Sequence, residues 1–272
     1  IYFTYIILVH ISIATSQRVV GYYPQWVQGS FTPDKIDYTV ITHVMHSFAW
    51  PDEEGNILHY DNMLSQSVTN TVHDNGAKIL LCLGGWGQSW GFSASMSTPE
   101  LREIFIDNII SICETYNYDG IDIDWEQPAN TTEKNNLTTF ITELRQAFDD
   151  LYPDWIISMA VPVSNWSGQY YDFDQLKQLV DFFNAMTYDM HGTWTDHAGH
   201  NSPLYQSPPG DPDGSVNTGI NYLVNTRGIE STKVNVGVPF YGKEYNASGI
   251  NQAFTGDVVS RLYNEYHGLI NN

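Results

Sequence analysis

The stretch at 119–126, which reads DGIDIDWE, places carboxylic acids at alternate positions. These acids are Asp122, Asp124 and Glu126. The alternation predicts a β-strand, in which successive side chains point to opposite faces, so the acids share one face. Burial and mutual repulsion both raise the pKa of crowded carboxyl groups. Such groups are suited to giving and taking protons, and the pattern therefore predicts general acid–base chemistry.

The other face of the same strand is apolar and has to be covered, most simply by helices outside a sheet. Its residues are Ile121, Ile123 and Trp125. The acidic face then looks inward, toward neighbouring strands. Asp119 is out of phase with the other acids and is expected at the start of the strand. Pro128 ends the strand, which makes Glu126 the acid nearest its C-terminal end.

Three other interpretations compete with catalysis. An acidic, solvent-facing edge strand would leave Trp125 and the isoleucines uncovered. A calcium loop starting at Asp122 needs glycine at its sixth position, where Gln127 stands. The third interpretation is a network of acids that is buried in the core of a barrel and has no catalytic role. We prefer catalysis because buried carboxyl groups are costly and are tolerated mainly where a shifted pKa is useful.

Length and composition bound the rest of the molecule. The chain has 272 residues, of which 42% are hydrophobic, so it is globular and long enough for one large domain. The net charge of −20 argues against nucleic acid or an anionic membrane as a partner, because both require clustered Lys and Arg. Aromatic residues make up 14%. They predict either an aromatic-rich core or a groove in which sugar rings stack on flat side chains.

The apolar segment 1–16, with Ala14 and Ser16 before Gln17, resembles the apolar region and cleavage site of a secretory signal peptide. It looks clipped at its N-terminus because no Met or basic region precedes it; a buried first strand is the alternative. A signal peptide predicts a secreted, extracellular protein that leaves the membrane once the signal is removed. Secretion also makes the asparagines of four N-x-S/T sequons candidate glycosylation sites. They are Asn130, Asn136, Asn165 and Asn246.

Alternating strands and helices are predicted along most of the chain. The strands are expected at 18–23, 41–48, 78–83, 119–126, 156–163, 182–188 and 234–239. The helices are expected at 61–75, after an N-cap at Thr98, and at 137–151, 175–180 and 219–225. This alternation predicts parallel strands with crossover helices, and seven such units favour a (β/α)8 TIM-type barrel. In that fold the active site lies at the C-terminal ends of the strands, where Glu126 is expected.

The two cysteines, Cys82 and Cys113, fall in a predicted strand and in the following helix. Secretion permits a disulfide, but these positions favour two buried thiols that pack as small hydrophobes. Several histidines lack a ligand pair of convincing spacing, so we interpret them as structural or surface residues. They are His43, His46, His191, His197 and His200.

The acidic strand matches the DGxDxDWE signature of glycoside hydrolase family 18, the chitinases, which the chain resembles from 19 to 243. Further segments resemble the family in the same order. These are LGGW at 83–86, MTYD at 186–189, GHNSPLY at 199–205 and PFYG at 239–242. Two positions depart from the pattern: Cys82 stands where many members have Ser and some have Ala, and Lys243 stands where Arg is common.

The resemblance implies hydrolysis of β-1,4-linked N-acetylglucosamine polymers, with the acetamido oxygen of the substrate as the nucleophile. Glu126 would be the general acid and then the base. Asp124 would orient the acetamido N–H and stabilise the oxazolinium ion, while Asp122 shares a proton with Asp124. Tyr188 would donate its hydroxyl to the acetyl oxygen.

The resemblance also implies residues that bind substrate, although core packing is the alternative for each aromatic one alone. They are Tyr23, Phe48, Trp86, Met186, Asp189, Trp194 and Tyr241. Asp119, Gly84 and Gly85 are implied to be structural parts of the signature. The expected partner is chitin or its oligosaccharides, bound by a monomer, and no metal or organic cofactor is implied.

Two other activities exist in the same family, a sugar-binding lectin without catalysis and an endo-β-N-acetylglucosaminidase. Glu126, which such lectins have lost, is present here and favours an enzyme. We expect a catalytic barrel at 17–243, and the start of an insertion or a truncated end, with a helix at 257–266, over 244–272. The barrel is therefore expected to be incomplete at its C-terminus, lacking the eighth strand, and this segment alone to be poorly soluble and weakly active.

Overall fold

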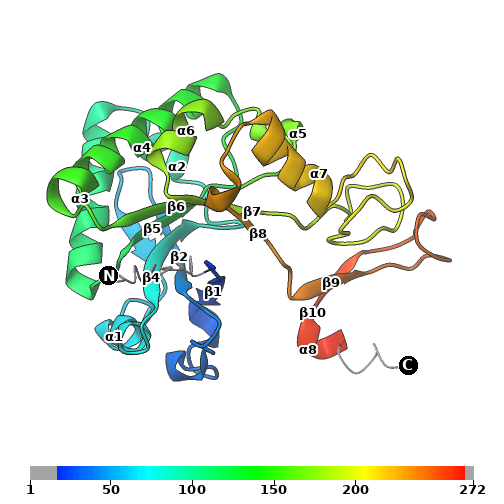
Figure 1. The fold of residues 1–272 in the computed structure, drawn as a ribbon, viewed down its shortest axis with the longest axis horizontal. Helices are drawn as coiled ribbons and strands as arrows, with labels where there is room; N and C mark the ends of the chain where they lie inside the picture. Colours follow the sequence, from blue (N-terminus) through cyan, green and yellow to red (C-terminus); the bar gives the residue numbers. More distant parts are fainter. Residues whose placement is uncertain (1–16, 267–272) are drawn as a thin grey trace, which may run out of the picture.

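The computed structural model describes residues 17–266, so the predicted signal peptide at 1–16 lies outside the described residues. Its centre is a curled sheet with helices on its outer face (Figure 1). Parallel strands follow one another in the order β1 (Val20–Pro24), β2 (His43–Pro51), β4 (Lys78–Gly84), β5 (Gly120–Asp124), β6 (Ile156–Val161), β7 (Phe182–Ala185) and β8 (Val234–Val236). A short strand, β3 (Ile57–His59), pairs antiparallel with β2. The architecture is the predicted α/β barrel type.

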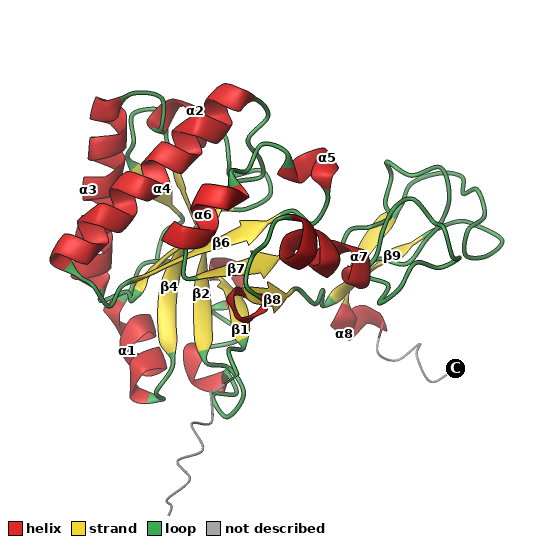
Figure 2. Cartoon of the chain, turned by 45° about the horizontal axis from the view of Figure 1, so that its top comes forward, coloured by secondary structure: helices red, strands yellow, loops and turns green. Residues whose placement is uncertain are grey.

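The main helices lie between successive strands and cover the outside of the sheet (Figure 2). They are α1 (Gln66–Asp74), α2 (Phe92–Ser95), α3 (Pro99–Tyr116), α4 (Thr131–Leu151), α5 (Asn165–Gly168), α6 (Phe173–Leu179) and α7 (Val216–Asn221). Short 3-10 or π turns occur at η1 (Gln25–Val27), η2 (Pro33–Lys35), η3 (Tyr222–Thr226) and η4 (Ser231–Lys233). The predicted N-cap is confirmed, because the Thr98 hydroxyl accepts a hydrogen bond from the backbone N–H of Leu101.

Helix α4 begins six residues before the predicted boundary. Its N-cap is Asn130, whose side chain accepts a hydrogen bond from the backbone N–H of Glu133 at 3.0 Å. The Glu133 carboxylate in turn accepts a hydrogen bond from the backbone N–H of Ala129. The prediction relied on the apolar face, which starts only at Leu137, and therefore missed a first turn held by polar capping contacts.

Two separate apolar cores confirm the predicted facing of β5. Ile121, Ile123 and Trp125 belong to the large core between the sheet and the helices. A smaller core lies on the inner face of the sheet and contains Met45, Leu80, Cys82 and Phe182. The acids of β5 therefore share the inside of the sheet with few apolar groups.

The sheet is open within residues 17–266, because β8 pairs with β7 but not with β1. At the N-terminal ends of the strands, Arg18 reaches across this opening. Its guanidinium group donates a hydrogen bond to the backbone carbonyl of Thr232 at 3.0 Å and lies 4.1 Å from the centre of the Phe182 ring. This contact brings the segments before β1 and β8 together without a strand-to-strand ladder.

The predicted helix at 257–266 is wrong in its first half. Residues Val259–Leu262 form β10, which pairs antiparallel with β9 (Tyr241–Glu244), and only α8 (Tyr263–Tyr266) is helical. Arg261 and Glu244 form an ion pair across this hairpin. Pairing with a strand that is distant in sequence overrode the local preference. No helix in the described part of the chain is long and apolar enough to cross a membrane.

Candidate active site

Asp122 lies at the centre of a hydrogen-bond network on the inner face of the sheet. Its fully buried carboxylate accepts hydrogen bonds from side chains of four different strands. The donors to Oδ2 are the Tyr22 hydroxyl at 2.9 Å and the Cys82 thiol at 3.2 Å. The donors to Oδ1 are the Ser158 hydroxyl at 2.5 Å and the Asn184 amide at 3.1 Å. Burial raises the pKa of Asp122, and these hydrogen bonds offset part of that rise.

Asp124 lies on the same face, two residues closer to the C-terminal end of β5. Burial raises its pKa well above the usual value, and the nearby Glu126 and Asp122 raise it further. Its Oδ1 atom is buried and has no hydrogen-bond partner among the described residues. A buried acceptor without a donor is costly, and such an atom is suited to receive an N–H group from a ligand.

Glu126 follows β5 by two residues and is partly buried. Burial is the main cause that raises its pKa, followed by the charge of Asp189. Its backbone N–H donates a hydrogen bond to the Ser89 hydroxyl at 3.0 Å. Ser89, which sequence reasoning missed, therefore anchors the backbone at Glu126 from the loop after β4.

Gly84 and Gly85 let the end of β4 approach β5 closely. Both have positive φ angles, of 107° and 82°. A Cβ atom on Gly84 would lie 2.1 Å from the backbone oxygen of Asp124, and one on Gly85 would lie 2.7 Å from the Phe48 ring. The Gly85 N–H also donates a hydrogen bond to that Asp124 oxygen at 2.8 Å. Only glycine fits these two positions, which agrees with their predicted structural role.

The segment after β7 brings further predicted residues to the acids. Burial raises the pKa of Tyr188, and the charges of Asp124 and Glu126 raise it further. Asp189 accepts a hydrogen bond from the Tyr241 hydroxyl at 2.7 Å. Met186, the residue that follows β7, has a half-buried side chain. Its backbone N–H donates a hydrogen bond to the backbone oxygen of Val161 in β6.

Lys243, one of the two departures from the family pattern, joins this group. Its ammonium nitrogen lies 2.8 Å from Asp189 Oδ1 and 5.3 Å from the centre of the Trp194 ring. Lys243 thus compensates the charge of Asp189 and supports Trp194 by a cation–π contact.

Several tryptophan side chains in the loops that follow the strands are exposed. Trp86 and Trp194 are 89% and 62% exposed, which fits substrate binding better than core packing. Trp26, which is not among the predicted site residues, is 64% exposed and stacks on Phe48 with ring centres 6.2 Å apart. A Trp two residues after the end of a strand was the signal available in the sequence.

The prediction that Tyr23 lines the groove is wrong. Its side chain is 4% exposed, belongs to the outer core, and donates its hydroxyl to the backbone oxygen of Phe31. The preceding residue, Tyr22, points inward and contacts Asp122. The two tyrosines point to opposite faces of β1, so an error of one residue moves the side chain to the other side of the sheet.

Asp119 lies at the opposite, N-terminal end of β5, where a structural role was expected. Its carboxylate contacts the His73 ring nitrogen at 2.7 Å, the Lys78 ammonium at 2.6 Å and the backbone N–H of Ile79 at 2.8 Å. These contacts join β5 to α1 and β4. Glycosylation of the four sequons stays a prediction, although Asn136 is only half-exposed on α4.

The two cysteines are free and buried, as predicted. Cys113 packs in the outer core, as a small hydrophobe would. The interpretation is incomplete for Cys82, whose thiol lies on the inner face and donates a hydrogen bond to Asp122.

The chain is similar to known proteins of one family. The sequence model of the glycosyl hydrolases of family 18 matches residues 18–266. A probable chitinase 10 of Drosophila melanogaster is 32% identical over 263 residues, which cover 86% of this chain and 11% of that protein. The first curated relatives are all longer, and the chain spans between 11% and 63% of their lengths.

Solved structures show the same fold. The Group IV chitinase of Ostrinia furnacalis superposes with a TM-score of 0.85 at 28% identity, covering 94% of this chain and 78% of that one. A second structure of that chitinase, in complex with allosamidin, gives a TM-score of 0.84 with the same identity and coverage.

Proposed function

The chain belongs to family 18 of the glycosyl hydrolases, and on that premise we propose that it is a secreted chitinase that hydrolyses β-1,4-linked N-acetylglucosamine polymers. The observation that carries the proposal is the acid series of β5, by which we mean Asp122 and Asp124 in the strand and Glu126 just after it. Glu126 has a raised pKa, and beside it Asp124 presents a buried oxygen without a hydrogen-bond donor. One group can therefore protonate a glycosidic oxygen while the other receives an acetamido N–H.

The reaction starts with proton transfer from Glu126 to the glycosidic oxygen, and the bond between this oxygen and the anomeric carbon breaks. The carbonyl oxygen of the substrate's own acetamido group forms a new bond to the anomeric carbon. The resulting oxazolinium ion is positively charged, and its N–H donates a hydrogen bond to the unpartnered oxygen of Asp124. Glu126, now ionised, removes a proton from water, which attacks the anomeric carbon and restores the acetamido group. Two inversions at one carbon give overall retention.

The proton shared by the two buried aspartates resides on Asp124 in this proposal. Asp122 accepts four hydrogen bonds that stabilise its ionised form, whereas burial and both charged neighbours of Asp124 favour its neutral form. Tyr188, whose pKa is raised by burial and by the charges of Asp124 and Glu126, donates its hydroxyl to the acetyl oxygen. Trp86 and Trp194 stack on sugar rings further along the polymer.

Turnover of chitin hexasaccharide, followed by NMR of the first product, tests this function. We expect the β-anomer to form first, and we expect allosamidin to inhibit, since the Ostrinia furnacalis relative binds it. Glu126→Gln keeps the shape of the side chain without its proton, and hydrolysis should fall by about 10²–10⁴-fold with oligosaccharide binding retained.

An initial α-anomer, or near-normal turnover by Glu126→Gln, would contradict the proposal. Release of N-glycans from a glycoprotein in the absence of chitin cleavage would instead identify an endo-β-N-acetylglucosaminidase. Binding without any turnover in the wild-type protein would identify a lectin.

A further inference from the structure

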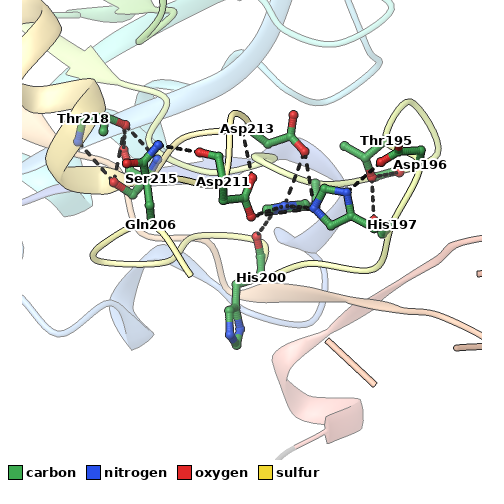
Figure 3. Close-up of polar contacts among 11 residues, drawn as sticks. Thr195, Asp196, His197, His200, Gln206, Asp211, Asp213, Ser215 and Thr218 are labelled. Carbon is green, nitrogen blue, oxygen red and sulfur yellow. Dashed lines mark hydrogen bonds and ion pairs between the residues drawn. The ribbon is translucent and has the colours of Figure 1, made fainter. Parts of the chain in front are cut away.

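Two histidines and two aspartates meet in the long connection between β7 and α7, outside the acid series of β5. They are His191, His197, Asp211 and Asp213, and each offers one ligand atom to a common centre. Figure 3 shows His197, Asp211 and Asp213 pointing toward one another from two separate loop segments. The side chains of His191 and Asp211 are almost fully buried, whereas those of His197 and Asp213 are partly exposed.

The spacing of the four ligand atoms is that of a tetrahedron. His191 Nε2 lies 3.2 Å from His197 Nε2, 3.2 Å from Asp211 Oδ2 and 3.5 Å from Asp213 Oδ2. His197 Nε2 lies 3.6 Å from each of the two carboxylate oxygens. Metal bonds of about 2.0–2.1 Å in tetrahedral geometry require ligand atoms about 3.3–3.4 Å apart. Five of the six separations fall close to that value, and the sixth is within 4.8 Å.

The second nitrogen of each imidazole ring is already engaged by an oxygen acceptor. His191 Nδ1 is 2.9 Å from the backbone oxygen of His200, and His197 Nδ1 is 2.8 Å from Asp196 Oδ1. These acceptors hold the proton of each neutral ring on Nδ1, so both Nε2 atoms present lone pairs to the centre. Two lone pairs and two carboxylate oxygens then face one another and repel unless a positive charge lies between them.

We propose that these four residues bind one zinc-type divalent metal ion with tetrahedral coordination. Imidazole nitrogen and carboxylate oxygen together suit Zn²⁺, whereas Ca²⁺ and Mg²⁺ require mostly oxygen ligands in larger numbers. The His191 ring is fixed in place by Gly199, where a Cβ atom would lie 2.0 Å from the ring. An open pocket lined by His197, Asp211 and Asn251 gives the ion a path from solvent.

The metal would act on the loop and not on the scissile bond. Trp194 lies between the two histidine ligands in sequence, and its ring packs over Gly192. The ion ties this segment to the one that holds Asp211 and Asp213, and so keeps Trp194 in position. The spacing of these histidines in the sequence matches no common ligand pair, which favoured a structural or surface role for them.

Zinc titration of the protein after dialysis against a chelator tests the proposal, with calorimetry for affinity and X-ray absorption for the ligand shell. We expect one Zn²⁺ per chain with nitrogen and oxygen ligands in tetrahedral geometry, and no comparable binding of Ca²⁺. His197→Gln and Asp213→Asn, both at partly exposed positions, should each weaken zinc binding by more than about 100-fold.

His200→Gln is the matched control, because only the backbone oxygen of His200 reaches the cluster and its ring points away (Figure 3). It should bind zinc as the wild-type protein does. Added zinc should also raise the melting temperature of the wild-type protein and of His200→Gln, but not of the other two variants. The proposal is overturned if zinc does not bind, or if all three variants bind it equally. It is also overturned if zinc leaves the melting temperature unchanged. In that case a protonated histidine, and not a metal ion, pairs with the two carboxylates.

Discussion

Cys82 lies directly opposite Asp122 in the register of β4 and β5, and its thiol donates a hydrogen bond to Asp122 Oδ2 at 3.2 Å. A thiol is a weak hydrogen-bond donor. A stronger donor at this position would stabilise the ionised form of Asp122 more, and a residue without a donor would stabilise it less. The resemblance to family 18 indicates Ser or Ala at the same position in other members. Substitution of Cys82 should therefore change the pKa of Asp122 while the other three hydrogen-bond donors remain in place.

Replacing Cys82 should move the pKa of Asp122 in opposite directions. Cys82→Ser introduces a stronger donor to the ionised carboxylate and should lower that pKa, whereas Cys82→Ala removes a donor and should raise it. NMR titration of the Asp122 carboxyl carbon measures both. Cys113→Ala, which changes the other buried thiol, is the control and should leave this titration unchanged. Equal shifts in the Ser and Ala variants would contradict the assignment.

The paired substitutions Tyr22→Phe and Tyr23→Phe should separate function from stability. Tyr22→Phe removes a hydrogen bond to Asp122 and should lower kcat, with little change in the melting temperature. Tyr23→Phe removes the buried hydrogen bond to Phe31 and should lower the free energy of unfolding by about 1 kcal/mol. Steady-state kinetics and thermal unfolding of both variants are the measurements. If Tyr23→Phe changes kcat and Tyr22→Phe does not, the facing of β1 is reversed.

Trp86→Ala and Trp194→Ala should weaken oligosaccharide binding without unfolding the protein. Both side chains are more than half exposed, and loss of a stacked ring should cost about 1–3 kcal/mol of binding, by analogy with aromatic stacking on other flat ligands. Trp125→Ala is the contrasting case, because Trp125 is buried and stacks on Phe92. It should reduce the free energy of unfolding by about 3–5 kcal/mol. A fall in the melting temperature for Trp86→Ala, with unchanged affinity, would assign it to the core.

The acid series should make the protein more stable as the pH falls from neutral. The pKa values of Asp124 and Glu126 are raised in the folded state, so protonation favours folding. Their stabilising contribution is complete below the ordinary carboxyl pKa of about 4 and is lost as the pH rises through the raised folded values. As the pH rises, the cost of ionising these two buried groups therefore destabilises the folded protein.

The double variant Asp124→Asn/Glu126→Gln removes this titration while preserving shape. It should melt at a higher temperature than the wild-type protein near neutral pH, and the difference should shrink as the pH falls toward about 4. Thermal unfolding across this range measures the difference directly. A difference that stays constant with pH would show that the two pKa values are not raised.

Local patterns in the sequence determined the facing of β5 and the start of α3. Alternation of period two placed Asp122 and Asp124 inside the sheet and Ile121 and Ile123 outside. Side-chain chemistry placed the cap at Thr98. These features depend only on residues a few positions apart, where backbone geometry fixes which side chains are neighbours.

Only the tertiary structure decided the features that join distant segments. The donors to Asp122 lie between 36 and 100 residues away in the chain, and their contact depends on the register of several strands at once. The orientation of β1 puts Tyr22, and not Tyr23, on the inner face beside Asp122. The strand β10 forms because it can pair with β9. The ligand atoms of His191 and Asp213 face each other because two irregular loops fold against one another. No short-range periodicity records such contacts, since they are set by packing between segments and not by spacing within one.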